Sequence, residues 1–304
     1  PASEGCLKAL RAEPAIKGLT DAITGLSEAQ GNVTLKRLEE IDLIVRSKDE
    51  DGTISIDAHP LIREYFAVQL RDKHPEAWKE AHSRLFDHLC ESTEHQPDTL
   101  EGLQPLYQAV SHGCSAGRYQ EACENVYFVR IKRRSERYST NKLGAFGADL
   151  GAIAAFFDEP WLTVSPKLSE PAQSWLFNEA AFSLCALGRL TEAIEPMRVG
   201  LEKRITARSW NNAAISASNL SELEVTLGRL SEAVENGQLS VEYADQSDID
   251  FQRMAMRTTA ADAFHHSGQR SRARDLFTEA EKMQAIRQPE YPMLYSIQGF
   301  RYDD

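Results

Sequence analysis

A turn motif that recurs at a fixed interval limits most strongly what this chain can fold into. Residues 188–193 (GRLTEA) return as 228–233 (GRLSEA) and, in altered form, as 268–273 (GQRSRA). The leading glycine therefore recurs from 188 to 228 and from 228 to 268, 40 residues in each case. A period of this length predicts a solenoid, in which each unit buries its apolar face by stacking on its neighbours. Such stacks present long binding surfaces, so the period favours binding over catalysis.

Each unit is predicted to be a helix, a tight turn and a second helix. Ahead of the first motif, Phe177, Ala180, Ala181 and Leu184 have the spacing of one helix face. The glycine is expected to end that helix in the left-handed conformation, which lacks a Cβ penalty only for glycine. The alanine that closes the motif is small, which predicts close approach of the two helices. Residues 117–122 (GRYQEA) add an upstream copy.

These residues resemble the tetratricopeptide repeat, whose consensus has glycine, a charged residue, an aromatic residue or leucine, and then Glu-Ala. Phe277 and Ala280 match later positions of that consensus, whereas Glu224 and Gly237 stand where it has apolar residues. The resemblance implies an all-α, tetratricopeptide-like α-solenoid of helical hairpins over residues 96–304. The alternative is an ordinary helical bundle.

Residues 1–95 do not follow the repeat and predict a separate small domain. Short helices are expected around residues 7–10, 16–26 and 35–41. Two β-prone runs, 43–46 and 53–56, flank a turn that ends in Asp51-Gly52, which predicts a β-hairpin. Three helices and a hairpin are the outline of a winged helix, and another helix is expected from Pro60.

The segment after the hairpin carries a second resemblance. Residues 57–66 (DAHPLIREYF) resemble the end of the winged helix in STAND-class signal-transducing ATPases of the NACHT and NB-ARC kind. That class has a Met-His-Asp triplet; His59 falls on its histidine, and Ala58 and Pro60 replace its neighbours. The resemblance implies that His59 senses bound ADP in an intact parent protein. The alternative is that His59 only caps the adjoining strand and helix.

Composition narrows the function further. A net charge of −12 argues against nucleic-acid binding, and five scattered cysteines without Cys-x-x-Cys are typical of a reducing cytoplasm. The chain lacks an 18-residue apolar run and a signal-peptide pattern, which predicts no membrane association. It begins without methionine and stops in an apolar stretch, 291–302, that looks like the first helix of another repeat. We therefore expect a fragment of a longer protein.

The sequence gives little sign of catalytic chemistry. The phosphate-binding pattern Gly-x-x-x-x-Gly-Lys-[Ser/Thr] is absent, so no cofactor is expected in this chain, although the resemblance implies ATP or ADP in the parent. The histidines and Cys90 lack metal-ligand spacing, so no metal is expected. A basic run, 130–137, is interpreted as a solvated helix end, with nucleic acid or an acidic neighbouring domain as alternatives.

Together, the resemblances predict the non-catalytic sensor and regulatory part of a STAND ATPase. Its repeats would bind a protein or peptide trigger, and its winged helix would couple that event to the upstream ATPase domain, with self-assembly on activation. Defence against viruses is a setting that the resemblance implies. The alternative is a repeat-containing transcription regulator with a DNA-binding winged helix. Its recognition helix, 34–41, sets Lys36 and Arg37 against Glu39 and Glu40, a poor balance for reading a groove.

The tetratricopeptide pattern also implies where a ligand would bind. In that family, the first helix of each hairpin lines the inner wall of the stack. The residues at these inner-wall positions include an aromatic anchor, hydrogen-bonding groups and carboxylates. This mixture suits a peptide or protein segment with a basic residue. Packing of the aromatic residues in the core, or cover by the span 138–172, is the alternative. The predicted groove residues are Trp175, Asn178, Phe182, Ser218, Glu222, Thr258, Asp262 and His265.

Overall fold

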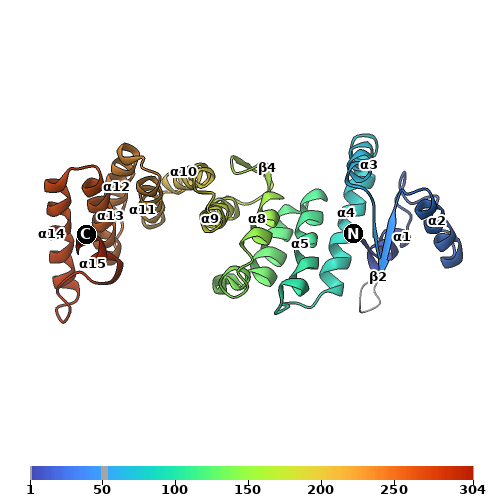
Figure 1. Ribbon diagram of the computed structural model, residues 1–304, viewed down its shortest axis with the longest axis horizontal. Helices are drawn as coiled ribbons and strands as arrows, with labels where there is room; N and C mark the ends of the chain where they lie inside the picture. Colours follow the sequence, from blue (N-terminus) through green and yellow to red (C-terminus); the bar gives the residue numbers. More distant parts are fainter. Residues whose placement is uncertain (1, 49–53, 304) are drawn as a thin grey trace. The chain divides into compact units, whose positions relative to one another are not determined.

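The chain forms two compact units, which are described separately (Figure 1). The computed structural model describes residues 2–48 and 54–303. Unit 1 comprises residues 1–156 and 165–172, and unit 2 comprises residues 157–164 and 173–304. This division follows contacts and does not test the predicted domain boundary near residue 95, which stays a prediction.

Unit 1 begins with a small sheet and its helices. Strands β1 (Ala2–Ser3), β2 (Val45–Lys48) and β3 (Ile54–Asp57) pair antiparallel in the order β1-β3-β2. The predicted β-hairpin is confirmed as β2 and β3, whereas its turn, including Asp51-Gly52, lies outside the described residues. Helices α1 (Glu4–Arg11), α2 (Glu28–Glu40) and α3 (Pro60–Lys73) accompany the sheet.

The expected helix over residues 16–26 is wrong. This segment forms successive turns, closed by hydrogen bonds from the Thr20 and Thr24 amides to carbonyls four residues earlier. The Thr20 hydroxyl accepts from the Ile16 amide at 2.7 Å. A threonine side chain that satisfies local backbone groups competes with helix formation, which explains the difference.

The rest of unit 1 is helical and closely packed. It comprises α4 (Pro75–Ser92), α5 (Leu100–Ser115), α6 (Tyr119–Glu121), a π-helix η1 (Ala122–Ile131), a short 3₁₀ helix η2 (Arg134–Glu136), α7 (Tyr138–Asn141) and α8 (Phe146–Ala154). A Cβ at Gly113 would lie 2.8 Å from Ala122 and 2.9 Å from the Phe86 ring. Glycine at this position of α5 therefore permits close contact with α4 and η1.

The interpretation of residues 130–137 as a solvated helix end is wrong. Arg130 is 7% exposed and donates to four carbonyls, those of Cys90, Thr93, Glu94 and His95, at 2.9–3.0 Å. These carbonyls follow or end α4, where a helix leaves acceptors unpaired. Arg133 likewise donates to the carbonyls of residues 96 and 97 and pairs with Asp98. Much of the basic run therefore closes the α4–α5 connection.

Lys132 of the same run enters a fully buried polar cluster. Its ammonium lies 2.9 Å from the Asp149 carboxylate, and the two side chains are 1% and 0% exposed. Asp149 also accepts from the hydroxyls of Tyr107 at 2.6 Å, Ser139 at 2.9 Å and Tyr127 at 3.3 Å. Residues five apart lie about one turn apart in a π-helix, so η1 directs Tyr127 and Lys132 to the same carboxylate.

The half-buried pair His82 and His112 is expected to make unit 1 sensitive to acid. Their Nδ1 atoms lie 2.7 Å apart, and burial, with His112 nearby, lowers the pKa of His82 to about 4. In the unfolded chain the pKa of a histidine is ~6.5, so the unfolded state binds a proton more readily than the folded state. The contribution of His82 to stability is therefore fully present above that pH and is lost as the pH falls toward 4. We expect a loss of about 1–2 kcal/mol, reduced from the full shift by partial solvent access.

Urea unfolding at pH 7.5 and 4.5 measures this effect. His82→Gln should lose less stability between the two conditions than the wild type. His95→Gln, at an exposed position, is the matched control and should keep the wild-type difference. An equal pH dependence in all three proteins would contradict the assignment.

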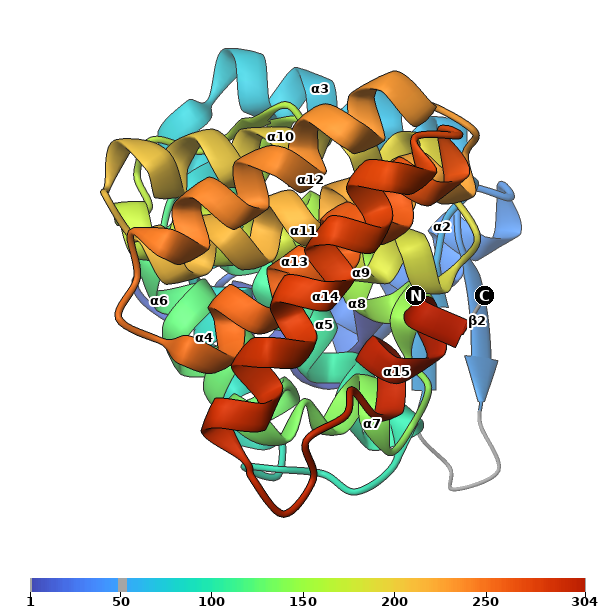
Figure 2. The ribbon, with the colours of Figure 1, turned by 90° about the vertical axis from the view of Figure 1, so that its left-hand side faces the viewer.

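Unit 2 is a stack of helical hairpins, as predicted. Strands β4 (Phe157–Glu159) and β5 (Thr163–Val164) pair at its start. Three hairpins follow: α9 (Glu170–Ala186), whose first turn lies in unit 1, with α10 (Leu190–Thr206); α11 (Trp210–Thr226) with α12 (Leu230–Asp245); and α13 (Asp250–His266) with α14 (Arg270–Arg287). The short helix α15 (Ser296–Asp303) comes last. Figure 2 shows α11 to α14 layered side by side.

The repeated motif makes the same turn in every hairpin. Gly188, Gly228 and Gly268 have φ of +73°, +73° and +81°. The residue after each glycine donates its amide to a carbonyl five residues earlier, at 2.8–2.9 Å. This is the Schellman arrangement, which satisfies carbonyls at a helix C-terminus. The motif alanines are buried between the helices, so both local predictions are confirmed.

The two departures of the second repeat from the consensus have structural reasons. A Cβ at Gly237 would lie 3.1 Å from the Ala260 Cα and 3.2 Å from the Ser221 hydroxyl, so glycine permits α12 to approach α13. Glu224, 1% exposed, accepts from the Asn236 amide at 2.8 Å, and burial raises the pKa of its carboxyl.

Gly237→Val is therefore expected to destabilise unit 2 by about 1–3 kcal/mol, because the added atoms meet backbone that cannot turn aside. Thermal unfolding measures the loss. Gln238→Val is the matched control, since Gln238 is the exposed neighbour of Gly237 in α12. Equal melting temperatures for the two variants would contradict close packing at Gly237.

Candidate protein-binding surface

The first helices of the last two complete hairpins, α11 and α13, share a polar contact. The Ser218 hydroxyl of α11 donates to the Thr259 hydroxyl of α13 at 3.0 Å, and Thr259 lies 3.4 Å from a Glu222 carboxylate oxygen. Ser218 and Thr259 are 3% and 2% exposed, whereas the Glu222 side chain is 43% exposed. We call the surface around these three residues the inner face. It presents the Glu222 carboxylate beside the Thr259 hydroxyl, which accepts a hydrogen bond from the buried Ser218.

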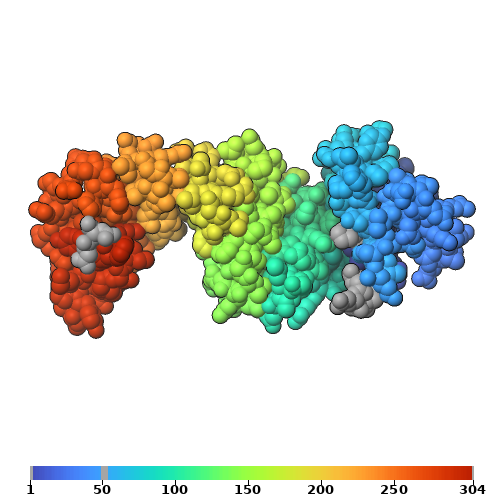
Figure 3. All heavy atoms as spheres, in the orientation of Figure 1, coloured from blue at the N-terminus to red at the C-terminus, as the bar shows by residue number. Residues whose placement is uncertain are grey.

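Helix α15 lies on this inner face. Its Arg301 donates to the Thr259 hydroxyl at 2.8 Å and forms a hydrogen-bonded ion pair with Glu222. The Arg301 side chain is only 14% exposed. Tyr302 stacks on Phe277 of α14, with ring centroids 4.8 Å apart and planes 20° apart. Figures 1 and 2 show α15 beside α13 and α14, and Figure 3 shows the C-terminal residues, in dark red, on the face of unit 2 turned to the viewer.

The structure gives the other predicted groove residues different surroundings. Thr258 is fully buried and donates to the Ala255 carbonyl at 2.8 Å, so it faces the hairpin packing. Asp262 lies 3.4 Å from His266 on its own helix, and His265 is half-buried. Trp175, Asn178 and Phe182 of α9 are half-buried. The structure therefore brings together Ser218 and Glu222, and ligand binding by the whole set stays a prediction.

Two members of the inner-face contact escaped the sequence prediction. Thr259 follows the predicted Thr258, and the count from the turn glycine selected its neighbour. Arg301 lies outside the hairpins, in a stretch that we expected to be the first helix of another repeat. A lone arginine carries no sequence signal for which carboxylate it meets.

His59 lies at the start of α3 and is exposed. Its Nδ1 accepts from the Leu61 amide at 3.3 Å, which is a helix N-cap contact. Next to it, Asp57 pairs with Arg63 at 3.1 Å. The capping role that we held as the alternative is present, and the nucleotide-sensing role stays a prediction.

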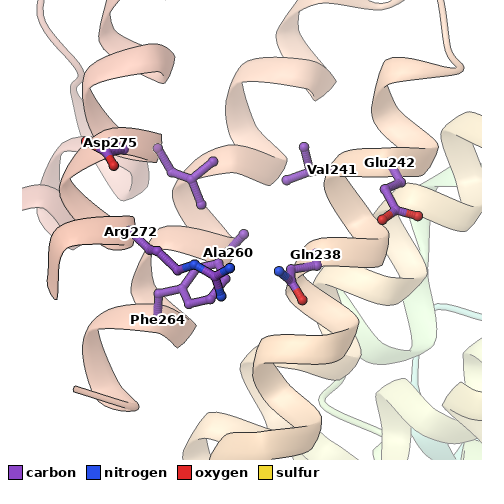
Figure 4. A pocket seen from close by; sticks show the side chains of 8 residues that line it. Gln238, Val241, Glu242, Ala260, Phe264, Arg272 and Asp275 are labelled. Atoms are coloured by element: carbon purple, nitrogen blue, oxygen red, sulfur yellow. The ribbon is translucent and has the colours of Figure 1, made fainter. Parts of the chain in front are cut away.

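A second groove lies between the helices of the last two hairpins. It has a volume of about 330 Å³ and is lined by α12, α13 and α14. Figure 4 shows Arg272 beside the Phe264 ring, and the guanidinium lies 5.3 Å from the ring centroid. The other lining residues form an apolar floor with a polar rim: Gln238, Val241, Glu242, Ala260, Asp275 and Leu276.

The described residues contain no group of three or more His, Cys, Asp or Glu side chains arranged to hold a metal ion. Within residues 2–48 and 54–303, no helix combines the length and apolar character needed to cross a membrane.

Comparisons with known proteins show no family for this chain. No protein-family model and no curated protein matches the chain. Two similar crystal structures contain nearly identical TPR-like repeats from Podosopora anserina, assigned to a kinesin light chain. One, a single-residue variant, is 17% identical with a TM-score of 0.40, over 75% of this chain and 95% of that chain. The other is 19% identical with a TM-score of 0.40, over 76% and 98%.

Proposed function

We propose that this chain is a non-catalytic protein-binding region that serves as the sensor part of a STAND-class ATPase in the cytoplasm. The observation that carries the binding role is the inner face, where Glu222 and Thr259 hold a guanidinium. Charge-assisted contacts of this kind suit recognition of a basic residue on a protein or peptide trigger. Helical hairpin repeats commonly act by binding proteins.

The N-terminal module supports the coupling role. On α3, next to His59, Leu61, Tyr65 and Phe66 are 68%, 62% and 61% exposed. Large apolar side chains gathered on one exposed helix suit a contact with another protein surface. The STAND resemblance assigns that surface to the upstream ATPase domain, with His59 directed at its nucleotide.

The DNA-binding alternative loses support at the helix that would read a groove. Lys36 of α2 lies 4.0 Å from Glu40, and Arg46 donates to Glu39 at 3.0 Å. Carboxylates of α2 thus lie beside the nearby cations Lys36 and Arg46 (the latter in β2), and a helix with this balance of charge is poorly suited to a phosphate backbone.

The coding sequence upstream of Pro1 tests the STAND proposal most cheaply. A phosphate-binding loop encoded there supports it, and a start codon directly before Pro1 contradicts it.

We also expect that the chain alone binds neither ATP nor ADP at micromolar concentration, because it lacks that loop. Isothermal titration measures this binding, and micromolar affinity would contradict the proposal that nucleotide is bound by the upstream ATPase domain. In a parent with the loop, His59→Ala should release ADP faster than His95→Ala, and equal rates would return His59 to capping alone.

A further inference from the structure

Arg301 of α15 contacts the inner face in the way that an arginine of a separate ligand would. Arg301 donates to residues of both α11 and α13, although α12, α13 and α14 lie between α11 and α15 in sequence. Its acceptors are prepared: Ser218 donates to Thr259, which leaves a lone pair of the Thr259 hydroxyl for the guanidinium. The acceptor geometry therefore suits a planar, branched donor better than a lysine ammonium.

Apolar side chains of α15 other than Tyr302 are exposed. Ile297 and Phe300 are 61% and 69% exposed. Before the helix, Tyr291 and Met293 are 65% and 69% exposed. The position of α15 depends on the contacts that it makes with α11, α13 and α14. Those contacts include the hydrogen bonds of Arg301 and the stacking of Tyr302 on Phe277.

The segment before α15 is tethered. The Gln284 side chain, 1% exposed, donates to the Tyr291 carbonyl at 2.8 Å, and the Tyr295 hydroxyl donates to Gln288 at 2.9 Å. A short tether gives α15 an effective concentration near the millimolar range at the inner face. An external ligand of similar chemistry must outcompete it.

We infer that the inner face is an arginine-recognition site and that α15 is its built-in competitor. This inference rests on the proposed binding role. A protein segment that presents an arginine to Glu222 and Thr259 displaces Arg301 and frees α15, whose exposed apolar side chains then become available for another contact. Ligand binding at the inner face is thereby linked to release of α15.

A peptide in trans tests the inference. The probe is a fluorescein-labelled peptide of residues 288–303, and fluorescence anisotropy measures its binding to the full chain. We expect Arg301→Ala to bind the peptide at least about tenfold more tightly than the wild type, because its own competitor is disabled. Arg274→Ala, which removes an exposed arginine of α14, should behave as the wild type.

Two further samples establish that the arginine is what is recognised. Adding Glu222→Gln to Arg301→Ala should abolish the gain, and so should a peptide in which alanine replaces Arg301. Circular dichroism confirms that each variant is folded, which the half-exposed Glu222 permits. Equal affinity of the wild type and Arg301→Ala, or binding that ignores Glu222, would overturn the inference. The upstream coding sequence tests the STAND assignment separately, so the two can fail independently.

Discussion

Replacing Asp149 with alanine is expected to lower the free energy of unfolding of unit 1 by about 3–5 kcal/mol. The change leaves the Lys132 ammonium, 1% exposed, without its carboxylate. It also removes the acceptor of the hydroxyls of Tyr107, Ser139 and Tyr127. An unpaired buried charge is costly because it has lost water and gained nothing in return. Urea unfolding followed by circular dichroism measures the loss.

Two controls separate the buried pair from a general effect of losing a carboxylate. Asp72→Ala removes a carboxylate whose side chain is 64% exposed and should change stability by less than about 0.5 kcal/mol. The double variant Lys132→Met/Asp149→Leu removes both charges and should recover the part of the loss that comes from the unpaired ammonium. The hydroxyls of Tyr107, Ser139 and Tyr127 still lack their acceptor, so recovery should be partial. A single variant as stable as the wild type would contradict the buried pair.

Arg130→Ala is expected to destabilise unit 1 by about 3 kcal/mol. Four carbonyls at the end of α4 then lose the donor that satisfies them. Arg130→Lys should recover only part of the loss, since an ammonium cannot reach four acceptors as a planar guanidinium does. Thermal and urea unfolding measure both variants.

Arg134→Gln is the matched control, because Arg134 belongs to the same basic run but is exposed. It should leave stability nearly unchanged. If Arg130→Ala and Arg134→Gln have equal, small effects, the basic run is a solvated helix end after all, as its sequence suggests.

The hairpin repeats could be predicted because their determinants are local. Each turn depends on one glycine in the left-handed region and one alanine between helices, and both stand at fixed positions in the motif. The β-hairpin was predictable for the same reason, from two β-prone runs. Residues 16–26 failed because apolar spacing suggested a helix, whereas the Thr20 side chain stabilises turns.

The buried cluster and the inner face could not be predicted because their partners are far apart in sequence. Lys132 directly follows the π-helix η1 and meets Asp149 of α8, and charge spacing carries no sign of the wider turn of a π-helix. Likewise, the family pattern gave Glu222 a place on the inner wall but could not indicate Arg301, 79 residues later. The tetratricopeptide resemblance implied which helices line the inner wall, and that stays a prediction, whereas the contact of Arg301 with Glu222 and Thr259 emerged only from the fold.

Hydrogen exchange of α15 under charge reversal tests the central claim most directly, namely that the inner face holds this helix through Arg301. In the wild type, the amides of residues 296–303 should exchange more slowly than those of a free short helix. Glu222→Arg and Arg301→Glu should each speed their exchange at least about tenfold, with Arg274→Glu as an unaffected control. The double variant Glu222→Arg/Arg301→Glu restores opposite charges and should restore protection. Unchanged exchange in both single variants, or no recovery in the double variant, would contradict the account.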